Sequence, residues 1–315
     1  MAEWLYEEGI GENRAILVED GVIVEAAIEL PGLRAGAVVA ARLTNAAGIA
    51  TLADGSEAIV AAPGLTEGAA FHAEIVREAI PEPGRPKPPR ARATDLPLRA
   101  GPSLADRIGN PAPLPGHGPD LFEQAGWSEL LEQAATGEIA FEGGALRMSL
   151  TPAMILFDVD GGLSPAVLAE AGAAAAARAI RRLDLAGSIG IDLPTLPRDR
   201  RQAAAAAVDA ILPQPFERTA VNGFGFLQIV RRRRRASLPE LLRADPVAAA
   251  SRALLRRAGR LAGPVTLHTA PKVVALLEAK PEWLAALARQ TGGGATLLGE
   301  PGLAISAGHV QSRQD

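Results

Sequence analysis

The chain of 315 residues contains no cysteine, and aromatic residues make up only 3% of it. The missing cysteine excludes disulfides, thiolate zinc sites and cysteine nucleophiles together. No stretch reaches the roughly 18 uninterrupted apolar residues that a membrane span needs, and the acidic N-terminus lacks the apolar segment of a signal peptide. We therefore expect a cytoplasmic protein without a membrane partner.

Lysine is also scarce, because Lys87, Lys272 and Lys280 are the only three and arginine supplies nearly all the positive charge. Arginine suits bidentate contact with phosphate, although the same bias can reflect a GC-rich genome. Hydrophobic residues make up 48% of the chain, whose formal net charge is −4. These values predict a folded protein with a buried core, as one large domain or two to three small ones.

The N-terminal part of the chain contains short β-like segments. Residues 14–30 are expected to form a hairpin, because Asp20-Gly21 lies between two apolar runs and favours a tight two-residue turn. Short apolar pieces separated by Gly, Asn and Pro continue over residues 33–80, a spacing typical of a small barrel. The stretch 81–103 is so rich in proline and arginine that we expect a mobile, positively charged loop. We place the Pro/Arg-rich linker between the barrel and the core at residues 95–118, which overlaps the end of this loop.

Residues 119–242 have the pattern of an α/β core. A helix is expected at about 119–136, and the apolar run "AMILFDV" then predicts a buried strand. An Ala-rich helix opens at Ser164 with Pro165, and a second strand, "SIGIDL", follows it before another Ala-rich helix. This strand-helix-strand unit predicts adjacent parallel strands, with Asp158 and Asp192 together at their carboxyl ends. Residues 243–315 are expected to form a small α/β domain.

Three carboxylates mark one edge of this predicted core. Asp158 and Asp160 are two positions apart on a strand end, so both point to the same face, and Asp192 ends the neighbouring strand. Like charges that close are unfavourable unless a cation lies between them, and Mg²⁺ is satisfied by one or two carboxylates with waters and a substrate phosphate. A turn at Asp160-Gly161-Gly162 and a strand-end cap at Asp192 are the structural alternative. We interpret the group as a divalent-metal site.

Two enzyme classes place such carboxylates after a buried strand. In phosphatases of the haloacid dehalogenase superfamily, the first Asp of a D-x-D-G-T loop is the nucleophile. Here Gly162 stands in place of the Thr, the motif lies in mid-chain, and no late acidic pair follows, since Asp245 is alone. These differences disfavour the phosphatase and leave a metal site that acts on a phosphodiester.

Two segments, "RAIRRLDLAGSIGID" and "LLEQAATGEIAFEGGALRMSLTPA", resemble the catalytic core of the ribonuclease E/G family. Residues 119–242 carry most of this resemblance. Residues 14–90 resemble the family's hairpin and S1-type barrel, and residues 245–308 its small domain, more weakly. The resemblance implies an α/β core of the ribonuclease E/G catalytic type, an N-terminal β-rich S1-like domain over residues 1–94 and a C-terminal small α/β domain.

The resemblance also implies an activity, that of an Mg²⁺-dependent endoribonuclease acting on single-stranded RNA in RNA processing or decay, with Mn²⁺ as a substitute ion. Asp158 and Asp192 would hold the metal, and Asp160, where many relatives have Asn, would orient the attacking water. These three residues form the expected catalytic set. The ion would polarise the phosphodiester and lower the pKa of its bound water.

The chain departs from the family pattern and looks like a trimmed relative. Gly223 stands where the family has an active-site arginine, the cysteine zinc link is absent, and the segment between barrel and core is too short for the family's 5′-monophosphate sensor. The barrel also has few aromatic residues for base stacking. A non-catalytic RNA-binding relative is therefore the alternative, and any homo-oligomer would have to rest on apolar contacts rather than on zinc.

Five consecutive arginines, Arg231 to Arg235, follow the strand "FGFLQIV". Such runs usually form a solvated edge, but arginine contacts with phosphate supply most of the sequence-independent affinity for nucleic acid. If the strand continues, Arg231, Arg233 and Arg235 share one face, and we expect these three to contact the RNA backbone together with Lys87. The four histidines are scattered without a ligand spacing and are expected to be structural or surface residues.

Overall fold

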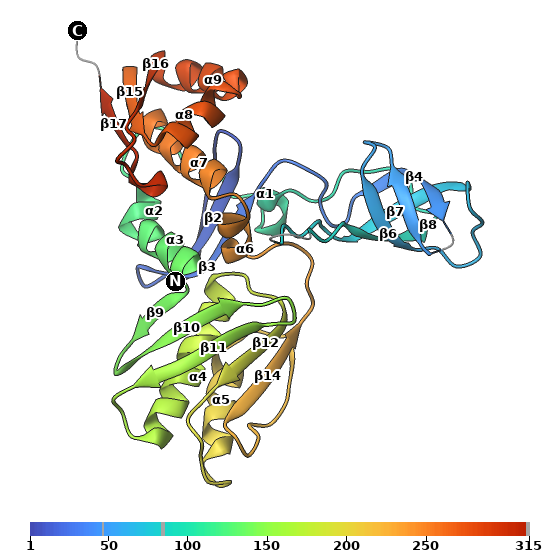
Figure 1. Cartoon of the computed structure of the whole chain (residues 1–315), viewed down its shortest axis with the longest axis vertical. Coiled ribbons are helices and arrows are strands. Elements are labelled where there is room, and N and C mark those ends of the chain that lie inside the picture. Colours follow the sequence, from blue (N-terminus) through green and yellow to red (C-terminus); the bar gives the residue numbers. More distant parts are fainter. Residues whose placement is uncertain (46, 83–85, 313–315) are drawn as a thin grey trace.

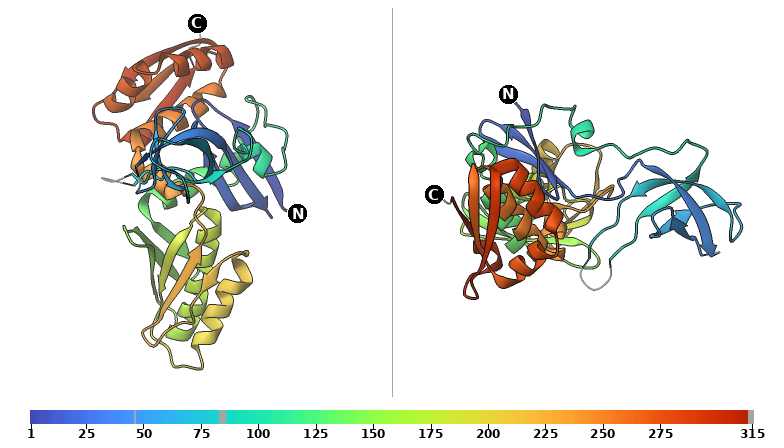
Figure 2. Two further views of the ribbon diagram at one scale, coloured as in Figure 1. Left: turned by 90° about the vertical axis from the view of Figure 1, so that its right-hand side faces the viewer. Right: turned by 90° about the horizontal axis from the view of Figure 1, so that it is seen from above.

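The computed structural model describes residues 1–45, 47–82 and 86–312 and is a mixed α/β protein with several sheets. Figure 1 shows a small N-terminal sheet near the centre, from which a barrel projects to one side. The largest sheet lies below this centre and the C-terminal sheet with its helices lies above it. The right-hand view of Figure 2 likewise shows the barrel standing apart from the rest. Within the described ranges, no helix is long and apolar enough to cross a membrane.

The N-terminal sheet is antiparallel and consists of β1 (Glu3–Glu8), β2 (Asn13–Glu19) and β3 (Val22–Glu29). The predicted hairpin is confirmed, because Asp20 and Gly21 both have the positive φ that its two-residue turn requires. One face of this sheet contributes Ile16 and Ile28 to the main core cluster, and β3 contacts the helix α4 (Pro165–Arg182). The hairpin therefore packs with the core, whereas the sequence grouped it with the barrel in residues 1–94.

The barrel is closed by five strands in the order β4-β5-β6-β8-β7. They are β4 (Val38–Asn45), β5 (Ile49–Leu52), β6 (Glu57–Ala61), β7 (Ala70–Arg77) and β8 (Arg90–Thr94). The prediction that the whole stretch 81–103 is a mobile loop is wrong for β8, which pairs with both β6 and β7. Its sequence "RARAT" alternates, so that Ala91 is buried in the barrel and Arg92 points outward to Glu74. Within that stretch, residues 83–85 lie outside the described residues.

The predicted linker of residues 95–118 is partly folded onto the N-terminal sheet. Arg99 pairs with Val38 at the start of the barrel, and the short helix α1 (Leu104–Arg107) begins at a capping box formed by Ser103 and Asp106. Leu104 is fully buried against the second face of the N-terminal sheet. This sheet therefore has a covered apolar surface on both faces.

The core sheet has the strand order β13-β14-β12-β11-β10-β9. The strands are β9 (Glu138–Phe141), β10 (Gly144–Leu150), β11 (Ile155–Gly161), β12 (Gly187–Asp192), β13 (Glu217–Arg218) and β14 (Phe226–Arg231). The predicted parallel pairing of β11 with β12 through a crossover helix is confirmed, and the other pairs are antiparallel. Before this sheet, the single helix expected at 119–136 is two helices, α2 (Leu121–Gln124) and α3 (Trp127–Thr136), because Gly126 between them has a φ of 93°.

Two Ala-rich helices, α4 (Pro165–Arg182) and α5 (Arg201–Ile211), cover one face of the core sheet (Figure 1). Gly172 lets α4 approach β11 closely, since a Cβ at this position would clash with Val159. Phe157 and Val159 of β11 are buried on this covered face. Leu156, Asp158 and Asp160 alternate with these buried residues and point to the other face of the sheet, which no helix of the described residues covers (Figure 1).

The C-terminal part begins with α6 (Leu238–Ala244), which packs against α3 and β3, and continues into a three-stranded sheet of order β16-β15-β17. Its remaining elements are α7 (Pro246–Gly259), β15 (Gly263–Thr269), α8 (Pro271–Glu278), α9 (Pro281–Thr291), β16 (Gly292–Gly299), the 3₁₀ turn η1 (Ile305–Ala307) and β17 (His309–Ser312). β15 pairs in parallel with β16 and antiparallel with β17.

Candidate functional site

Asp158 and Asp192 lie directly opposite each other at the carboxyl ends of β11 and β12. Alternation in each strand produces this placement, because Phe157 and Ile191 are buried beneath the helices while the aspartates take the open face. Asp158 is half-buried and Asp192 is exposed. Neighbouring strands are about 4.8 Å apart. The two carboxylates are therefore side by side on a surface that solvent and substrate can reach.

Asp160 lies on the same face but farther along β11. Its neighbour in register is Ala145 of β10, and β12 ends at Asp192 before reaching this level. Among the described residues, Asp158, Asp160 and Asp192 do not form a group of three whose ligand atoms all lie within 4.8 Å of one another. The structure thus brings together two of the three predicted carboxylates, because β11 continues three residues beyond Asp158, to Gly161, whereas β12 ends opposite Asp158.

No hydrogen bond or ion pair engages the side chains of Asp158 or Asp192 in the described part of the chain. The nearest arginine in register is Arg147 of β10, but its guanidinium donates to Glu138 of β9 at 3.2 Å. The two adjacent carboxylates therefore have no ion-pair partner of their own among the described residues. This is the electrostatic condition in which a bound metal ion stabilises a site.

Two phenylalanines lie beside Asp192, and the sequence analysis did not single them out. Phe226 is the in-register neighbour of Asp192 on β14, and its ring lies over Gly190, where a Cβ would clash with it. Phe224, in the turn before β14, is 86% exposed. The pattern "GFGF" is the signal that could have found them, because aromatic rings on an exposed surface suit stacking with nucleobases.

The arginine run lies at the opposite end of the core sheet from the carboxylates. Arg231 is in register with Gly187 at the start of β12, five residues or about 16 Å from Asp192. The strand ends at Arg231, so the expected continuation through Arg235 does not occur.

The three arginines that were predicted to face RNA are instead engaged within the protein. Arg231 donates to the backbone oxygen of Leu185 at 2.8 Å, and burial lowers its pKa. Arg233 forms ion pairs with Glu82 and Glu240, and Arg235 pairs with Asp184 at 2.6 Å. Sequence could not reveal these partners, because Glu82 and Asp184 come from distant segments. The exposed members of the run are Arg232 and Arg234.

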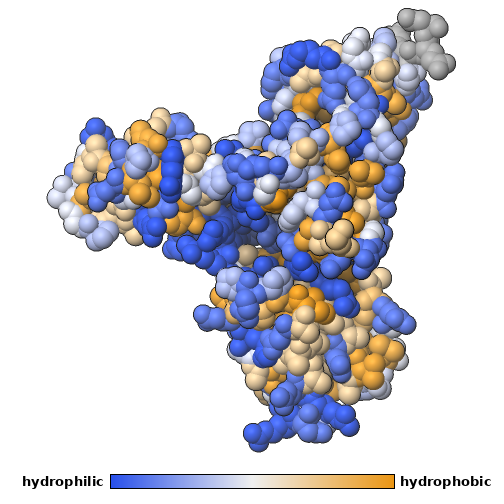
Figure 3. All heavy atoms as spheres, turned by 180° about the vertical axis from the view of Figure 1, so that it is seen from behind, coloured by the Kyte–Doolittle hydropathy of each residue, from blue (hydrophilic) through white to orange (hydrophobic). Residues whose placement is uncertain are grey.

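Lys87 is likewise held by a protein partner, since its Nζ lies 2.5 Å from Glu82 Oε1. It borders a pocket of about 330 Å³ at the amino ends of β11 and β12, lined also by Arg233 and Arg243. Figure 3 shows that the surface between the barrel and the rest of the molecule is hollowed and largely hydrophilic. Lys87 remains 38% exposed, so its predicted contact with RNA stays a prediction.

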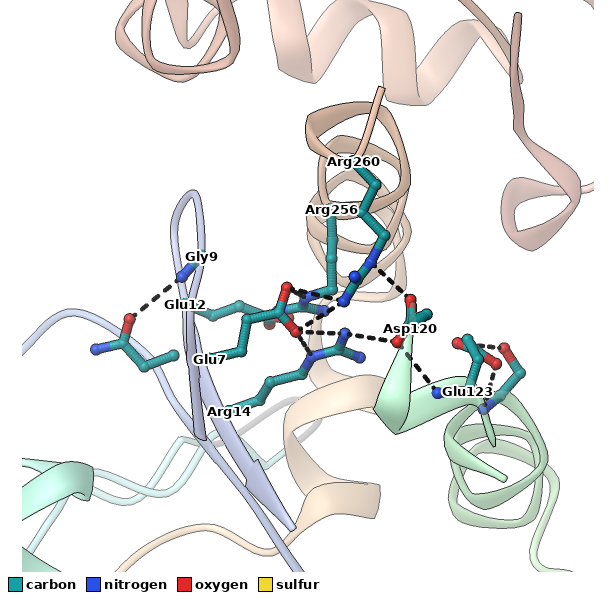
Figure 4. Close-up of polar contacts among 10 residues, drawn as sticks. Glu7, Gly9, Glu12, Arg14, Asp120, Glu123, Arg256 and Arg260 are labelled. Carbon is teal, nitrogen blue, oxygen red and sulfur yellow. Dashed lines mark hydrogen bonds and ion pairs between the residues drawn. The ribbon is translucent and has the colours of Figure 1, made fainter. Parts of the chain in front are cut away.

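A buried ion-pair network joins β1, β2 and the turn between them to α7 (Figure 4). Glu12 accepts hydrogen bonds from Arg252 at 2.7 Å and Arg256 at 2.6 Å. A second branch links further charges, namely Arg14 with Glu7 at 2.6 Å and Arg260 with Asp120 at 2.7 Å. Burial, with repulsion from Arg256, lowers the pKa of Arg14 to about 10. Because these groups are packed between elements far from the open sheet face, we assign the network a structural role.

Comparison with known proteins adds no assignment: neither the models of protein families nor the sequences of curated proteins match this chain. The geometry of the described residues therefore carries the functional argument, beside the sequence resemblance.

Proposed function

We propose that this protein is an Mg²⁺-dependent endoribonuclease that hydrolyses phosphodiester bonds in single-stranded RNA. The observation that carries the proposal is the pair of adjacent carboxylates, Asp158 and Asp192, on an open sheet face, where neither has an ion-pair partner among the described residues. Their position supports it further, because ligands of α/β sheets bind at the carboxyl ends of the strands. The sequence resemblance to the ribonuclease E/G family points to the same two residues.

The donor set fits a magnesium ion. Mg²⁺ prefers oxygen ligands and keeps several of its waters, so that one or two carboxylates and a substrate phosphate complete its shell. Asp158 and Asp192 provide these carboxylates, and the absence of a covering helix leaves space for waters and for a polynucleotide. A bound Mg²⁺ would supply Lewis-acid stabilisation of the phosphate and a water of lowered pKa.

The protein's own residues would then position the substrate and a water. Asp160, exposed and two positions beyond Asp158 on the same face, would accept a hydrogen bond from a water that approaches the phosphorus from the open side. Phe224 and Phe226 offer ring faces on which bases flanking the cleaved bond can stack. Stacking tolerates any base, so this arrangement predicts weak sequence preference at the site.

Metal removal provides the direct test of this function. We expect the purified protein to cleave an unstructured RNA labelled at its 5′ end when Mg²⁺ is present, and cleavage to stop when EDTA is added in excess. Readdition of Mg²⁺ or Mn²⁺ should restore it, since the carboxylates bind hard divalent ions reversibly. Equal cleavage with and without EDTA would contradict the proposal and point to a contaminating metal-independent nuclease.

A non-catalytic RNA-binding protein is the second candidate, and Gly223 is the observation that favours it. This exposed glycine stands where the family resemblance predicts an arginine, and a Cβ there would meet nothing within 4 Å. The arginine of the family pattern is therefore missing at this position, and the space next to the backbone is open. RNA binding without Mg²⁺-dependent cleavage in the same assay would favour this candidate.

The exposed arginines give a prediction for binding that applies to either candidate. Replacing Arg232 and Arg234 by Gln should weaken RNA binding for all sequences alike and reduce the magnitude of the slope of log K against log salt by about 1.4, because each lost contact with a single strand accounts for about 0.7. The matched pair Arg231→Gln and Arg235→Gln should leave this slope unchanged, since these side chains bind within the protein.

Fluorescence anisotropy with a labelled oligonucleotide over a range of salt concentrations measures both slopes. If only the substitution of Arg231 and Arg235 changes the slope, these side chains contact RNA, as the sequence predicts. A slope that responds to neither pair would show that the run does not contact RNA.

A further inference from the structure

Two histidines and a glutamate meet in the C-terminal sheet. Among the described residues, His268, Glu300 and His309 are the one group of three metal-ligating side chains whose ligand atoms all lie within 4.8 Å of one another. His268 lies in the central strand β15, directly opposite His309 in the edge strand β17, and Glu300 follows β16 on the other side. The backbone N–H of Glu300 donates to the backbone oxygen of Thr269 at 2.8 Å, which anchors the backbone of the residue that carries this carboxylate.

The three side chains are already ordered with respect to one another. The Nδ1–H of His268 donates to Glu300 Oε1 at 2.7 Å, and the imidazole rings of His268 and His309 are stacked, with centroids 4.6 Å apart and planes inclined by 10°. His268 and Glu300 are half-buried, whereas His309 is exposed. His268 and Glu300 are thus held together by a hydrogen bond, His309 lies next to them, and the group can be reached from solvent.

We propose that His268, Glu300 and His309 bind a Zn²⁺ ion. Imidazole nitrogen and carboxylate oxygen are ligands of zinc in proteins, and three such ligands leave a fourth tetrahedral position for water. The two imidazoles disfavour Mg²⁺, which prefers oxygen ligands. This site therefore differs in chemistry and in place from the carboxylate pair of β11 and β12, and it does not depend on the proposed ribonuclease function.

The observed distances are compatible with a metal after small side-chain rotations. Bonds of about 2.0 to 2.1 Å at tetrahedral angles separate two ligand atoms by roughly 3.3 Å. The Nδ1 to Oε1 pair at 2.7 Å would have to open, with the ion taking the place of the proton between His268 and Glu300. The other ligand atoms already lie within 4.8 Å, and the ring of His309 would have to tilt out of the stack, because the lone pairs of an imidazole lie in its ring plane.

A metal at this position would also connect three strands. It would tie the edge strand β17 to the central strand β15 and to the segment after β16. Binding to the folded state alone stabilises that state. We therefore expect Zn²⁺ to slow amide hydrogen exchange in β17.

Isothermal titration of the full-length protein with ZnCl₂ tests the proposal, with Mg²⁺ present to occupy the carboxylate pair. Wild type should bind one ion with high affinity, and Glu300→Gln and His309→Gln should each weaken this binding by more than about 100-fold, because losing even a group that supports a ligand costs 10- to 100-fold. His117→Gln is the matched control, since it removes an exposed histidine that lies outside the group. Asp192→Asn should bind Zn²⁺ like wild type.

Circular dichroism confirms that each variant is folded, and hydrogen exchange of β17 provides the second measurement. Loss of high-affinity binding in Glu300→Gln and His309→Gln alone, with slower exchange in wild type, supports the site. Equal binding by wild type and His309→Gln, or no high-affinity binding by wild type, overturns it. Loss of binding in Asp192→Asn would also overturn it, because the ion would then occupy the carboxylate pair.

Discussion

Asp192→Asn is expected to reduce Mg²⁺-dependent RNA cleavage by about a thousandfold while the fold stays intact. An amide has the shape of the carboxylate but no charge, so the metal would lose half of the charge that the adjacent pair provides. Metal-assisted stabilisation of transition-state charge amounts to several kcal/mol, and about 4 kcal/mol corresponds to a thousandfold change in rate. Asp192 is exposed and has no hydrogen-bond partner among the described residues, so the substitution removes no structural contact.

Single-turnover cleavage of labelled RNA at saturating Mg²⁺ measures this effect, with Asp95→Asn as the matched control. Asp95 is also exposed and without a described partner, but it lies beyond the barrel strand β8. Asp158→Asn should match Asp192→Asn, whereas Asp160→Asn should cost less, because Asp160 does not lie opposite the other two. Undiminished cleavage by folded Asp192→Asn would remove the metal-site argument.

The part of this site that could be predicted from sequence rests on local pattern. The runs "AMILFDV" and "SIGIDL", with a helix between them, fix two adjacent parallel strands, and alternation then fixes the face on which Asp158 and Asp192 lie. Nothing beyond the chain direction and the strand period is needed. Asp160 lies on the predicted face, but the pattern does not show that β12 ends before the level of Asp160, so the sequence could not place this residue relative to Asp192.

The parts that could not be predicted depend on contacts between distant segments. Arg233 and Arg235 look like a solvated or RNA-binding face in the sequence, yet they pair with Glu82, Glu240 and Asp184. Likewise, His268 and His309 have no ligand spacing, and only the antiparallel pairing of β15 with β17 brings them together. Long-range strand pairing and ion pairing of this kind leave no periodic signal in a single sequence.

The second large effect concerns stability and the buried network of Figure 4. Glu12→Gln is expected to lower the free energy of unfolding by about 3 to 5 kcal/mol, the usual cost of removing one partner from a buried ion pair. Glu12 and its partners Arg252 and Arg256 are each at least nine-tenths buried. Without the carboxylate, the buried guanidinium of Arg252 would have no counter-charge, and Arg256 would keep only Glu7, whose Oε1 lies 3.8 Å from its Nε. The substitution would therefore destabilise the contact between the β1–β2 turn and α7.

Urea denaturation followed by circular dichroism at pH 7 measures this loss, with Glu138→Gln as the matched control. Glu138 also pairs with an arginine, Arg147 at 3.2 Å, but both side chains are more than half exposed, and such pairs contribute about 0 to 1 kcal/mol. A loss for Glu12→Gln as small as that for Glu138→Gln would show that the buried charges are not coupled as the distances indicate.

The pH dependence of this difference follows from the pKa of Glu12. Burial raises the pKa of this carboxyl, but the charges of Arg256 and Arg252 and their hydrogen bonds outweigh that effect and hold the pKa below its ordinary value of 4.5. A carboxyl whose pKa is lower in the folded state binds fewer protons there than in the unfolded state, so its stabilising contribution is complete above about pH 5 and decreases as the pH falls through the folded-state pKa.

The difference in free energy of unfolding between wild type and Glu12→Gln should therefore be constant from pH 5.5 to pH 7. It should narrow below pH 4.5, as protonation converts the wild-type carboxylate into a neutral group like the amide. A gap that stays constant down to pH 3 would show that Glu12 contributes through packing and not through its charge.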